Sequence, residues 1–362
     1  MPRICTLCIG LLAVLGGVSA RACDVPVFRF ALERWRPGMY RVLVYHHGTL
    51  SADQQTLCKS LEALSVDHEG LGNFSVERVV LDGKPDPDAL AIFKAQPQPA
   101  LPWMVVCYPD NDPSIPCAWA GPLTAANIGL VADSPVRKAV AQRLIGGDSA
   151  VWILLASDDA ALDDAAAKTL QTELKRLESE IKLPEDPAAR PEDKPLKLAF
   201  SVVRLTPGDP AEAALLGNLL RRDPEVAKRR EPIAFPVFGR GRALCALVGE
   251  KMISRDNIEA AAKFLTGPCS CEVKDQNPGI DLLMVTDWGA AFAAAKPVES
   301  QLPTLGPPVP ERSAPAVATP VAVAPAPTGT LYRNLLITLA AAAIVIVGIA
   351  VTLTLRDRRT EN

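Results

Sequence analysis

Apolar residues along residues 24–147 follow two periods in turn, one typical of strands and one of helices. Short runs rich in Val, Leu and aromatic residues fit strands, whereas Leu57, Leu61 and Leu64 recur at the spacing of one helix face. Ser134 before Pro135 is typical of a helix start. The pattern predicts strands at 41–45, 76–81, 103–108 and around 117–119, and helices from Ser51, over 87–95 and from Ser134 to Gly146.

The same order of patterns returns along residues 148–295. Leu170, Leu174, Leu177 and Ile181 lie on one face of a predicted helix over 163–181. It is preceded by a predicted strand at 151–156 and followed by one at 198–205. We then expect a helix over 210–221 capped by Asp209, a hairpin of 233–238 with 243–249, and a last helix from Ser254 to Gly267.

One uncharged apolar stretch begins at Leu335 and ends at Leu355. About 20 apolar residues in a helix cover the ~30 Å hydrocarbon core of a bilayer, so the stretch predicts a membrane span over 333–355. The three arginines that follow, Arg356, Arg358 and Arg359, fit the positive-inside bias. The short tail 356–362 is therefore expected in the cytoplasm.

The beginning of the chain has the parts of a secretory signal over residues 1–22. Arg3 precedes an apolar core at 9–18, and Ala20 and Ala22 form a small-x-small cleavage site. The mature chain would begin at Cys23. The alternative is a lipoprotein signal, which also cuts before a cysteine and would leave Cys23 acylated. Both readings predict a single-pass protein of the cell membrane whose bulk is exported to the periplasm.

The repeated pattern divides the exported part into two folded regions, 23–147 and 148–295, and composition sets off a stalk after them. Nine prolines lie between 297 and 327, so the linker 296–330 is expected to be extended. The formal net charge of −3 falls to about −5 once Arg3 and Arg21 are removed with the signal. A mildly acidic chain without a basic stripe is not expected to bind nucleic acid.

The order strand–helix–strand–helix–strand–strand–helix, found twice, resembles tandem thioredoxin-like βαβαββα domains of the α/β class. Residues 233–238, a tight turn, residues 246–249 and a helix look like the second half of that fold. In the family, the proline entering the hairpin is cis and faces the active site. The resemblance therefore implies a binding face at Pro102 and Pro236. The chain is also similar to uncharacterised bacterial envelope proteins of this build.

The resemblance also implies where a reactive cysteine would lie, and neither copy has one there. Thioredoxin-like redox proteins place a thiolate at the end of the first strand, beside a helix N-terminus. Here that place holds His46 and His47 in the first copy and Ser157 and Asp158 in the second. We therefore expect non-catalytic modules. Adjacent residues at a strand end point opposite ways, so the two histidines are weak candidates for binding or for a shared metal.

Seven cysteines remain after cleavage, an odd number in a compartment that permits disulfides. Cys107 and Cys117 flank the first hairpin and are candidates for a structural disulfide. Cys23 with Cys58, and Cys245 with one of the last two cysteines, are further candidates. Cys269 and Cys271 are one residue apart, which also suits a labile disulfide or a copper(I) site.

The sequence thus favours a membrane-tethered exported protein that binds or assembles an envelope partner, without a cofactor. The alternative is an envelope thiol-redox or copper-handling protein that acts through Cys269 and Cys271. A hydrolase is disfavoured because no nucleophile elbow or zinc-binding H-E-x-x-H motif is present.

Overall fold

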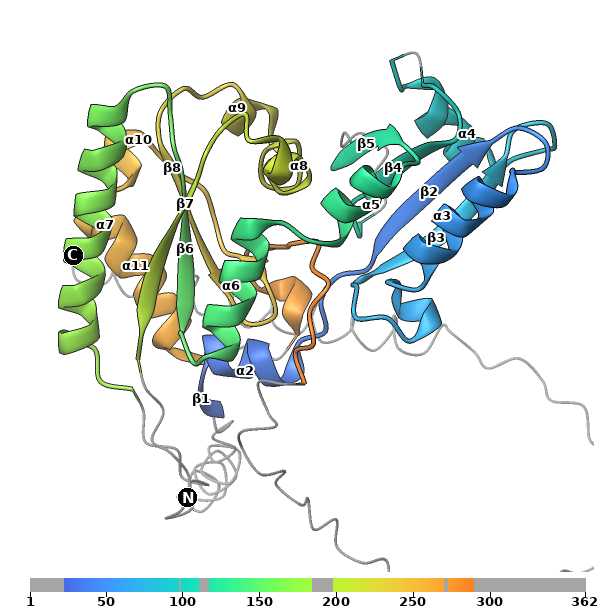
Figure 1. The fold of residues 1–362 in the computed structure, drawn as a ribbon. Helices are drawn as coiled ribbons and strands as arrows, with labels where there is room; N and C mark the ends of the chain where they lie inside the picture. The colour runs from blue at the N-terminus through green and yellow to red at the C-terminus, as the bar shows by residue number, and fades with distance from the viewer. Residues whose placement is uncertain (1–22, 98, 111–116, 184–197, 270–272, 290–362) are drawn as a thin grey trace, which may run out of the picture. The chain divides into compact units, whose positions relative to one another are not determined.

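The computed structural model describes residues 23–97, 99–110, 117–183, 198–269 and 273–289. Over these residues the chain is a mixed α/β protein with two main sheets and a short two-stranded ladder (Figure 1). Contacts divide the chain into two units, Met1–Val298 and Glu299–Asn362. The second unit lies wholly outside the described residues, so the two sheets both belong to the first.

The first sheet has the strand order β3-β2-β4-β5. The central strand β2 runs parallel to β3 and antiparallel to β4, and β4 is antiparallel to β5. The strands are β2 (Tyr40–His46), β3 (Phe74–Val80), β4 (Trp103–Cys107) and β5 (Trp119–Pro122), and the helices are α3 (Ala52–Glu62), α4 (Pro87–Lys94) and α5 (Ala125–Ala132).

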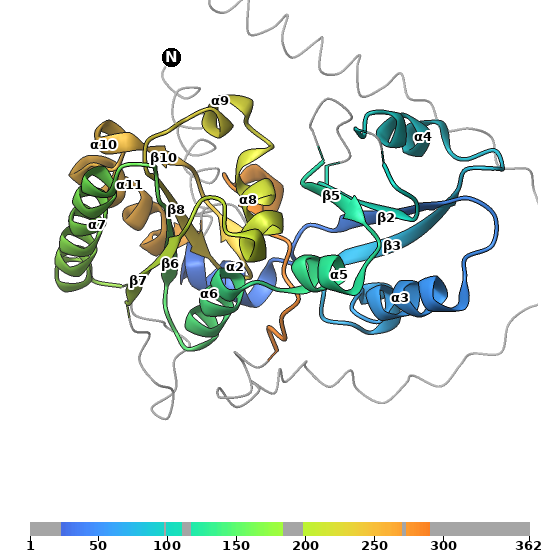
Figure 2. The ribbon, with the colours of Figure 1, turned by 45° about the horizontal axis from the view of Figure 1, so that its top comes forward.

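Alternate residues of β2 pack on opposite faces of this sheet, as the two-residue period of a strand requires. Val42 and Val44 belong to the core shared with α3 and α5. Leu43 and Tyr45 belong to the core shared with α4, and the Tyr45 hydroxyl donates to the Ala89 carbonyl at 2.7 Å. The sheet is therefore covered by helices on both faces, as Figure 2 shows.

The second main sheet has the order β12-β9-β8-β6-β7, with β10 also paired to β8. Its central strand β6 again runs parallel to one neighbour, β7, and antiparallel to the other, β8. The strands are β6 (Ala150–Leu155), β7 (Phe200–Leu205), β8 (Ile233–Phe238), β9 (Arg242–Ala243), β10 (Leu247–Val248) and β12 (Ile280–Asp281).

Helices cover both faces of the second sheet as well (Figure 1). One core contains α2 (Val27–Arg34), α7 (Ala160–Glu180) and α11 (Arg255–Thr266). The other contains α6 (Pro135–Ile145), α8 (Ala213–Leu220) and the buried tail residues Leu282, Met284 and Trp288. Shorter pieces complete the unit: β1 (Cys23–Pro26), α9 (Pro224–Ala227), α10 (Gly249–Met252) and β11 (Pro268–Cys269).

Two helices pack away from the copy in which their sequence position places them. The helix from Ser134 was expected to close the first copy, but α5 does so, and α6 buries Val140 and Leu144 against the second sheet. The N-terminal helix α2 likewise joins the second sheet's core. The cores on the second sheet therefore include helices from outside the second copy.

The predicted second hairpin is also interrupted. Residues 243–249 were expected as one strand, but β9 and β10 pair with β8 separately, and the Leu244 amide donates to the Pro236 carbonyl at 2.9 Å between them. Most other predicted strands and helices are found within a few residues of their expected bounds.

No helix among the described residues is long and apolar enough to cross a bilayer. The predicted signal 1–22, linker 296–330, span 333–355 and tail 356–362 lie outside the described residues.

Candidate functional site

The end of β2, where the resemblance implied a site, carries one buried and one exposed histidine. His46 is 7% exposed, and its Nδ1 lies 3.1 Å from the Gly48 carbonyl oxygen. His47 is solvent-exposed and its Nδ1 lies 2.7 Å from Oδ1 of Asp82, which follows β3. The two rings are therefore in different environments, as adjacent positions at a strand end predict.

Asp82 ties the ends of the two parallel strands together. The Gly48 amide donates to its Oδ2, and His47 holds its Oδ1. These contacts, the Gly48 hydrogen bond first and the His47 hydrogen bond second, lower the pKa of Asp82. Gly48 has φ +50°, a left-handed conformation that favours glycine here.

The end of β6 leads into a turn whose polar groups form hydrogen bonds with one another. Asp159 accepts hydrogen bonds from the amides of Ala161 and Leu162 and so caps α7. Both the amide and the hydroxyl of Ser157 donate to Oδ1 of Asp163 at 2.8 Å. The polar groups of this turn are therefore used to start a helix, which is the ordinary role of such residues.

The cysteines of the first sheet's layer lie away from the carboxyl ends of β2 and β6. Cys58 is fully buried in the middle of α3, and Cys107 lies across from Arg41, at the other end of β2 from His46. The Sγ atoms of Cys107 and Cys117 are 3.9 Å apart, close enough that the predicted pairing is geometrically reasonable, and both residues are free thiols here. The hydrogen bond to Cys117 and burial raise the pKa of Cys107.

The two prolines of the predicted binding face occupy different places. Pro102 enters β4 after the cis peptide Leu101–Pro102, and its carbonyl accepts from the Leu123 amide at 2.8 Å. Pro236 lies within β8, opposite Trp152, and the peptide bond before it is trans, unlike the cis bond that the resemblance implied. The counterpart of Pro102 is Pro232, which enters β8 and whose carbonyl accepts from the Gly249 amide at 2.8 Å. The sequence match of Pro236 with Pro102 was therefore wrong by four residues.

A groove of about 390 Å³ lies on the second sheet's side of the molecule. Its lining is mainly apolar and includes Leu219, Val226, Phe235, Ala246 and Ile280. The exposed Cys245 also lines it, and partial burial raises the pKa of that thiol. No local sequence pattern indicates this groove, because its residues come from four separate segments.

The charged groups of the groove are already paired within the chain. Arg222 Nη1 lies 2.5 Å from Oδ2 of Asp110, and the guanidinium lies 5.9 Å from the Tyr108 ring centre. Asp223 accepts from the amides of Glu225 and Val226 and so caps α9. A ligand of the groove would therefore be selected by apolar contact.

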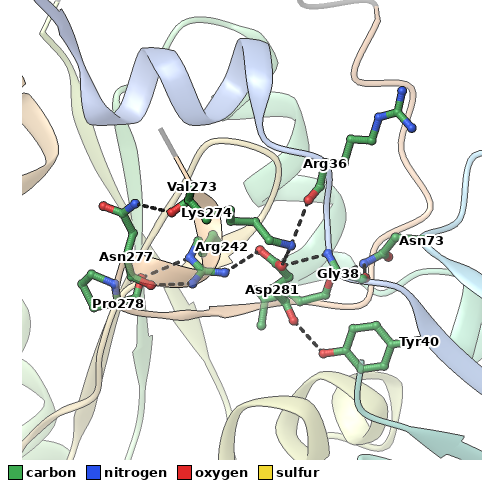
Figure 3. Close-up of polar contacts among 11 residues, drawn as sticks. Arg36, Gly38, Tyr40, Asn73, Arg242, Val273, Lys274, Asn277, Pro278 and Asp281 are labelled. Atoms are coloured by element: carbon green, nitrogen blue, oxygen red, sulfur yellow. Dashed lines mark hydrogen bonds and ion pairs between the residues drawn. The ribbon is translucent and has the colours of Figure 1, made fainter. Parts of the chain in front are cut away.

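A buried carboxylate, Asp281, gathers three segments of the chain around the second sheet's edge (Figure 3). Its Oδ1 lies 3.1 Å from Arg242 Nη1, and its Oδ2 lies 2.7 Å from Lys274 Nζ and 2.8 Å from the Gly38 nitrogen. The Tyr40 hydroxyl donates to the Asp281 carbonyl at 2.6 Å. Burial raises the pKa of Tyr40, so this phenol stays protonated as a donor.

Two buried amides continue this network along residues 282–284. Asn73 donates to the Leu282 carbonyl and accepts from the Met284 amide at 2.7 Å, while Asn218 accepts from the Leu283 amide at 2.8 Å. We call residues 281–284 with Asn73, Asn218 and Arg242 the tail clasp. Its partners come from the first sheet's side and from the second's, so it joins them and leaves few groups for a ligand.

Cys269 has a described backbone in β11, paired with Cys23, and Cys271 lies outside the described residues. Over the described part of the chain, no group of three or more His, Cys, Asp or Glu residues is placed to hold a metal ion.

Comparison of the chain with models of protein families and with curated proteins gave no match.

Proposed function

We propose that this chain is a membrane-tethered exported protein that binds or assembles an envelope partner through two thioredoxin-like units without a catalytic thiol pair. The observation that carries the proposal is the chemistry at the ends of β2 and β6. Both ends lead into helices whose starts are capped, by Ser51 and by Asp159. Thiol exchange needs a low-pKa thiol at such a place, and these ends carry histidines and capping groups instead.

The shared topology supports the fold part of the proposal. In each main sheet the first strand is central, runs parallel to the second and antiparallel to the third. The matching hydrogen bonds to Pro102 and Pro232 extend the likeness to the strand entries. Strand order β7-β6-β8-β9 repeats β3-β2-β4-β5, which is the order expected of a thioredoxin-like unit.

The groove is the surface best suited to a partner. Its volume falls in the lower part of the ~300–1,000 Å³ range of ligand sites, and its paired charges leave apolar contact as the attraction. We therefore propose that an apolar segment of an exported partner protein occupies it. Anchoring through residues 335–355, with the linker 296–330 as a stalk, would present the groove at a distance from the bilayer.

The test uses Cys245, which lines the groove, as the attachment point for a photoreactive thiol reagent on the full chain in its native membrane. We expect a discrete adduct with one partner in wild type. The adduct should be lost in Ala246→Arg, which places a charge in the groove, and in Cys245→Ser. It should persist in Ala165→Arg, the same change at an exposed position of α7. An adduct unaffected by a folded Ala246→Arg variant would contradict the proposal.

The redox or copper alternative through Cys269 and Cys271 stays a prediction from their spacing. The same preparation separates it from binding, because disulfide turnover or stoichiometric copper that depends on both thiols would favour the alternative.

A further inference from the structure

The terminal ladder, formed by β1 and β11, brings two cysteines from opposite ends of the folded chain together. β1 and β11 are antiparallel, with Cys23 opposite Cys269 and Pro26 opposite Pro268. Just beyond, the Val27 amide donates to the Gly267 carbonyl at 3.0 Å, which continues the pairing into α2. The backbone thus sets one cysteine against another across 245 intervening positions of sequence.

That placement meets the backbone requirement of a disulfide. Residues directly opposite in an antiparallel ladder have Cα atoms about 4.5–5.5 Å apart. Disulfides join cysteines whose Cα atoms are about 4.4–6.8 Å apart. The Cα spacing of a directly opposed pair therefore suits a cross-strand bridge.

Both strands of the ladder are held by packed helices rather than by their own short length. Val27, Phe28 and Ala31 of α2 are buried in the same core as Ile258 and Leu265 of α11. Because β1 leads directly into α2 and β11 follows α11, this core keeps the two strands side by side, and a bulge in β1 between Cys23 and Pro26 sets the pairing of Cys23 with Cys269. The two strands are therefore brought together by the helices that pack on the second sheet, and the ladder pairing places the two cysteines opposite each other.

The other pairings considered for these cysteines fit the structure less well. Cys58 is fully buried between α3 and the first sheet, whereas β1 belongs with the second sheet's helices. Cys245 lines the groove beside β9, with residues of α8, α9, β8 and the tail. The register of the terminal ladder favours Cys23 as the partner of Cys269.

We propose that Cys23 and Cys269 form a disulfide that links the first residue of the mature chain to the strand after its last helix. The step rests on the proposed export. Two thiols lose two protons and two electrons, one S–S bond forms, and the disulfide of an exported thiol oxidoreductase is reduced to a dithiol. Cys23 then has no thiol to acylate, and Cys269 cannot cycle with Cys271.

The experiment traps thiols with iodoacetamide in the full chain purified from membranes and maps linked peptides by mass spectrometry without reduction. We expect a peptide that joins Cys23 to Cys269. The link should be lost in Cys269→Ser and kept in Cys271→Ser, which is a matched control two residues away, and in Cys58→Ser. A link from Cys23 to Cys271 or Cys58, a Cys269–Cys271 link, or an acylated Cys23 would overturn the pairing.

A second arm separates this proposal from the proposed export. The reduced full chain is reoxidised in a glutathione buffer, and the same peptides are mapped. The side of the membrane on which the chain lies is measured by its cleavage with external protease in intact cells. A chain that is protected from the protease, and so cytoplasmic, but forms the Cys23–Cys269 link on reoxidation would refute export and keep the pairing. An exported chain that forms no such link in either arm would refute the pairing and keep the proposed function.

Discussion

Single buried residues hold residues 281–284 against the rest of the folded chain. Asp281 is the residue whose substitution tests this most directly. Its side chain is 9% exposed and that of Arg242 is 8% exposed, so the Arg242 charge depends on Asp281 for compensation. Lys274 and the Gly38 amide use the second carboxylate oxygen. Removing one member of a buried ion pair is strongly destabilising because it leaves the other charge uncompensated.

We therefore expect Asp281→Asn to lower the free energy of unfolding of residues 23–289 by about 3 kcal/mol. The matched control is Asp164→Asn, which breaks the exposed ion pair with Arg204 and should change it by less than about 1 kcal/mol. Urea unfolding of both variants measures the difference. Equal effects would contradict the structural role of the tail clasp.

Asp82 gives a pH-dependent contribution whose sign follows from its lowered pKa. A carboxyl with a lowered folded pKa stabilises the fold fully above its unfolded pKa of about 3.9. That stability is lost as the pH falls through the lower folded pKa. We expect the urea midpoint of wild type to exceed that of Asp82→Asn at pH 5, and the gap to close toward pH 2. A gap that is constant over this range would refute the Gly48–Asp82–His47 contact.

At the scale of elements, α6 belongs to the second sheet although the sequence places it at the end of the first copy. Val140 is fully buried and Leu144 is 2% exposed, both in the core that contains β6 and β8. We expect Leu144→Ala to destabilise the protein by about 2–5 kcal/mol. Amide hydrogen exchange should accelerate in β6 and β7 more than in β2 and β3. Faster exchange confined to β2 and β3 would show that the sequence-based grouping was right.

The elements that sequence reasoning predicted well are those specified locally. Ser134 accepts from the Arg137 amide and Asp209 from the Ala211 amide, as capping residues should. The predictions that were wrong concern which elements pack or pair with each other. Caps define where α6 begins and ends but not which sheet it covers. Pro232 precedes β8 and Pro236 lies within it, so choosing between them required the pairing of β8 with β6 and β10.

The candidate sites show the same division. The histidine pair at the end of β2 was found because a strand end can be located from its pattern. The groove and the tail clasp join segments far apart in sequence, and no local pattern specifies such contacts. The signal for the clasp was a single carboxylate, Asp281, inside the apolar run 280–285. A charge at that position predicts a buried partner of opposite charge, but the sequence alone does not show that the partner is Arg242.

At the scale of the whole molecule, the described chain is interlocked rather than a series of independent copies. The second sheet is completed by α2 from the N-terminal end, α6 from between the copies and β12 from the tail. We therefore expect residues 148–289 alone to expose apolar core and to aggregate, whereas residues 23–289 fold cooperatively. Circular dichroism and size-exclusion chromatography of both fragments test this, and a stable monomer of 148–289 would contradict it.

The central claim is that this protein works by contact and not by thiol turnover. The most direct measurement is the rate at which the full chain, purified with its membrane span in detergent, reduces a protein disulfide in the presence of dithiothreitol. We predict a rate equal to that of dithiothreitol alone, unchanged in Cys269→Ser and Cys271→Ser. A faster rate that disappears in either variant would contradict the account and establish a redox function.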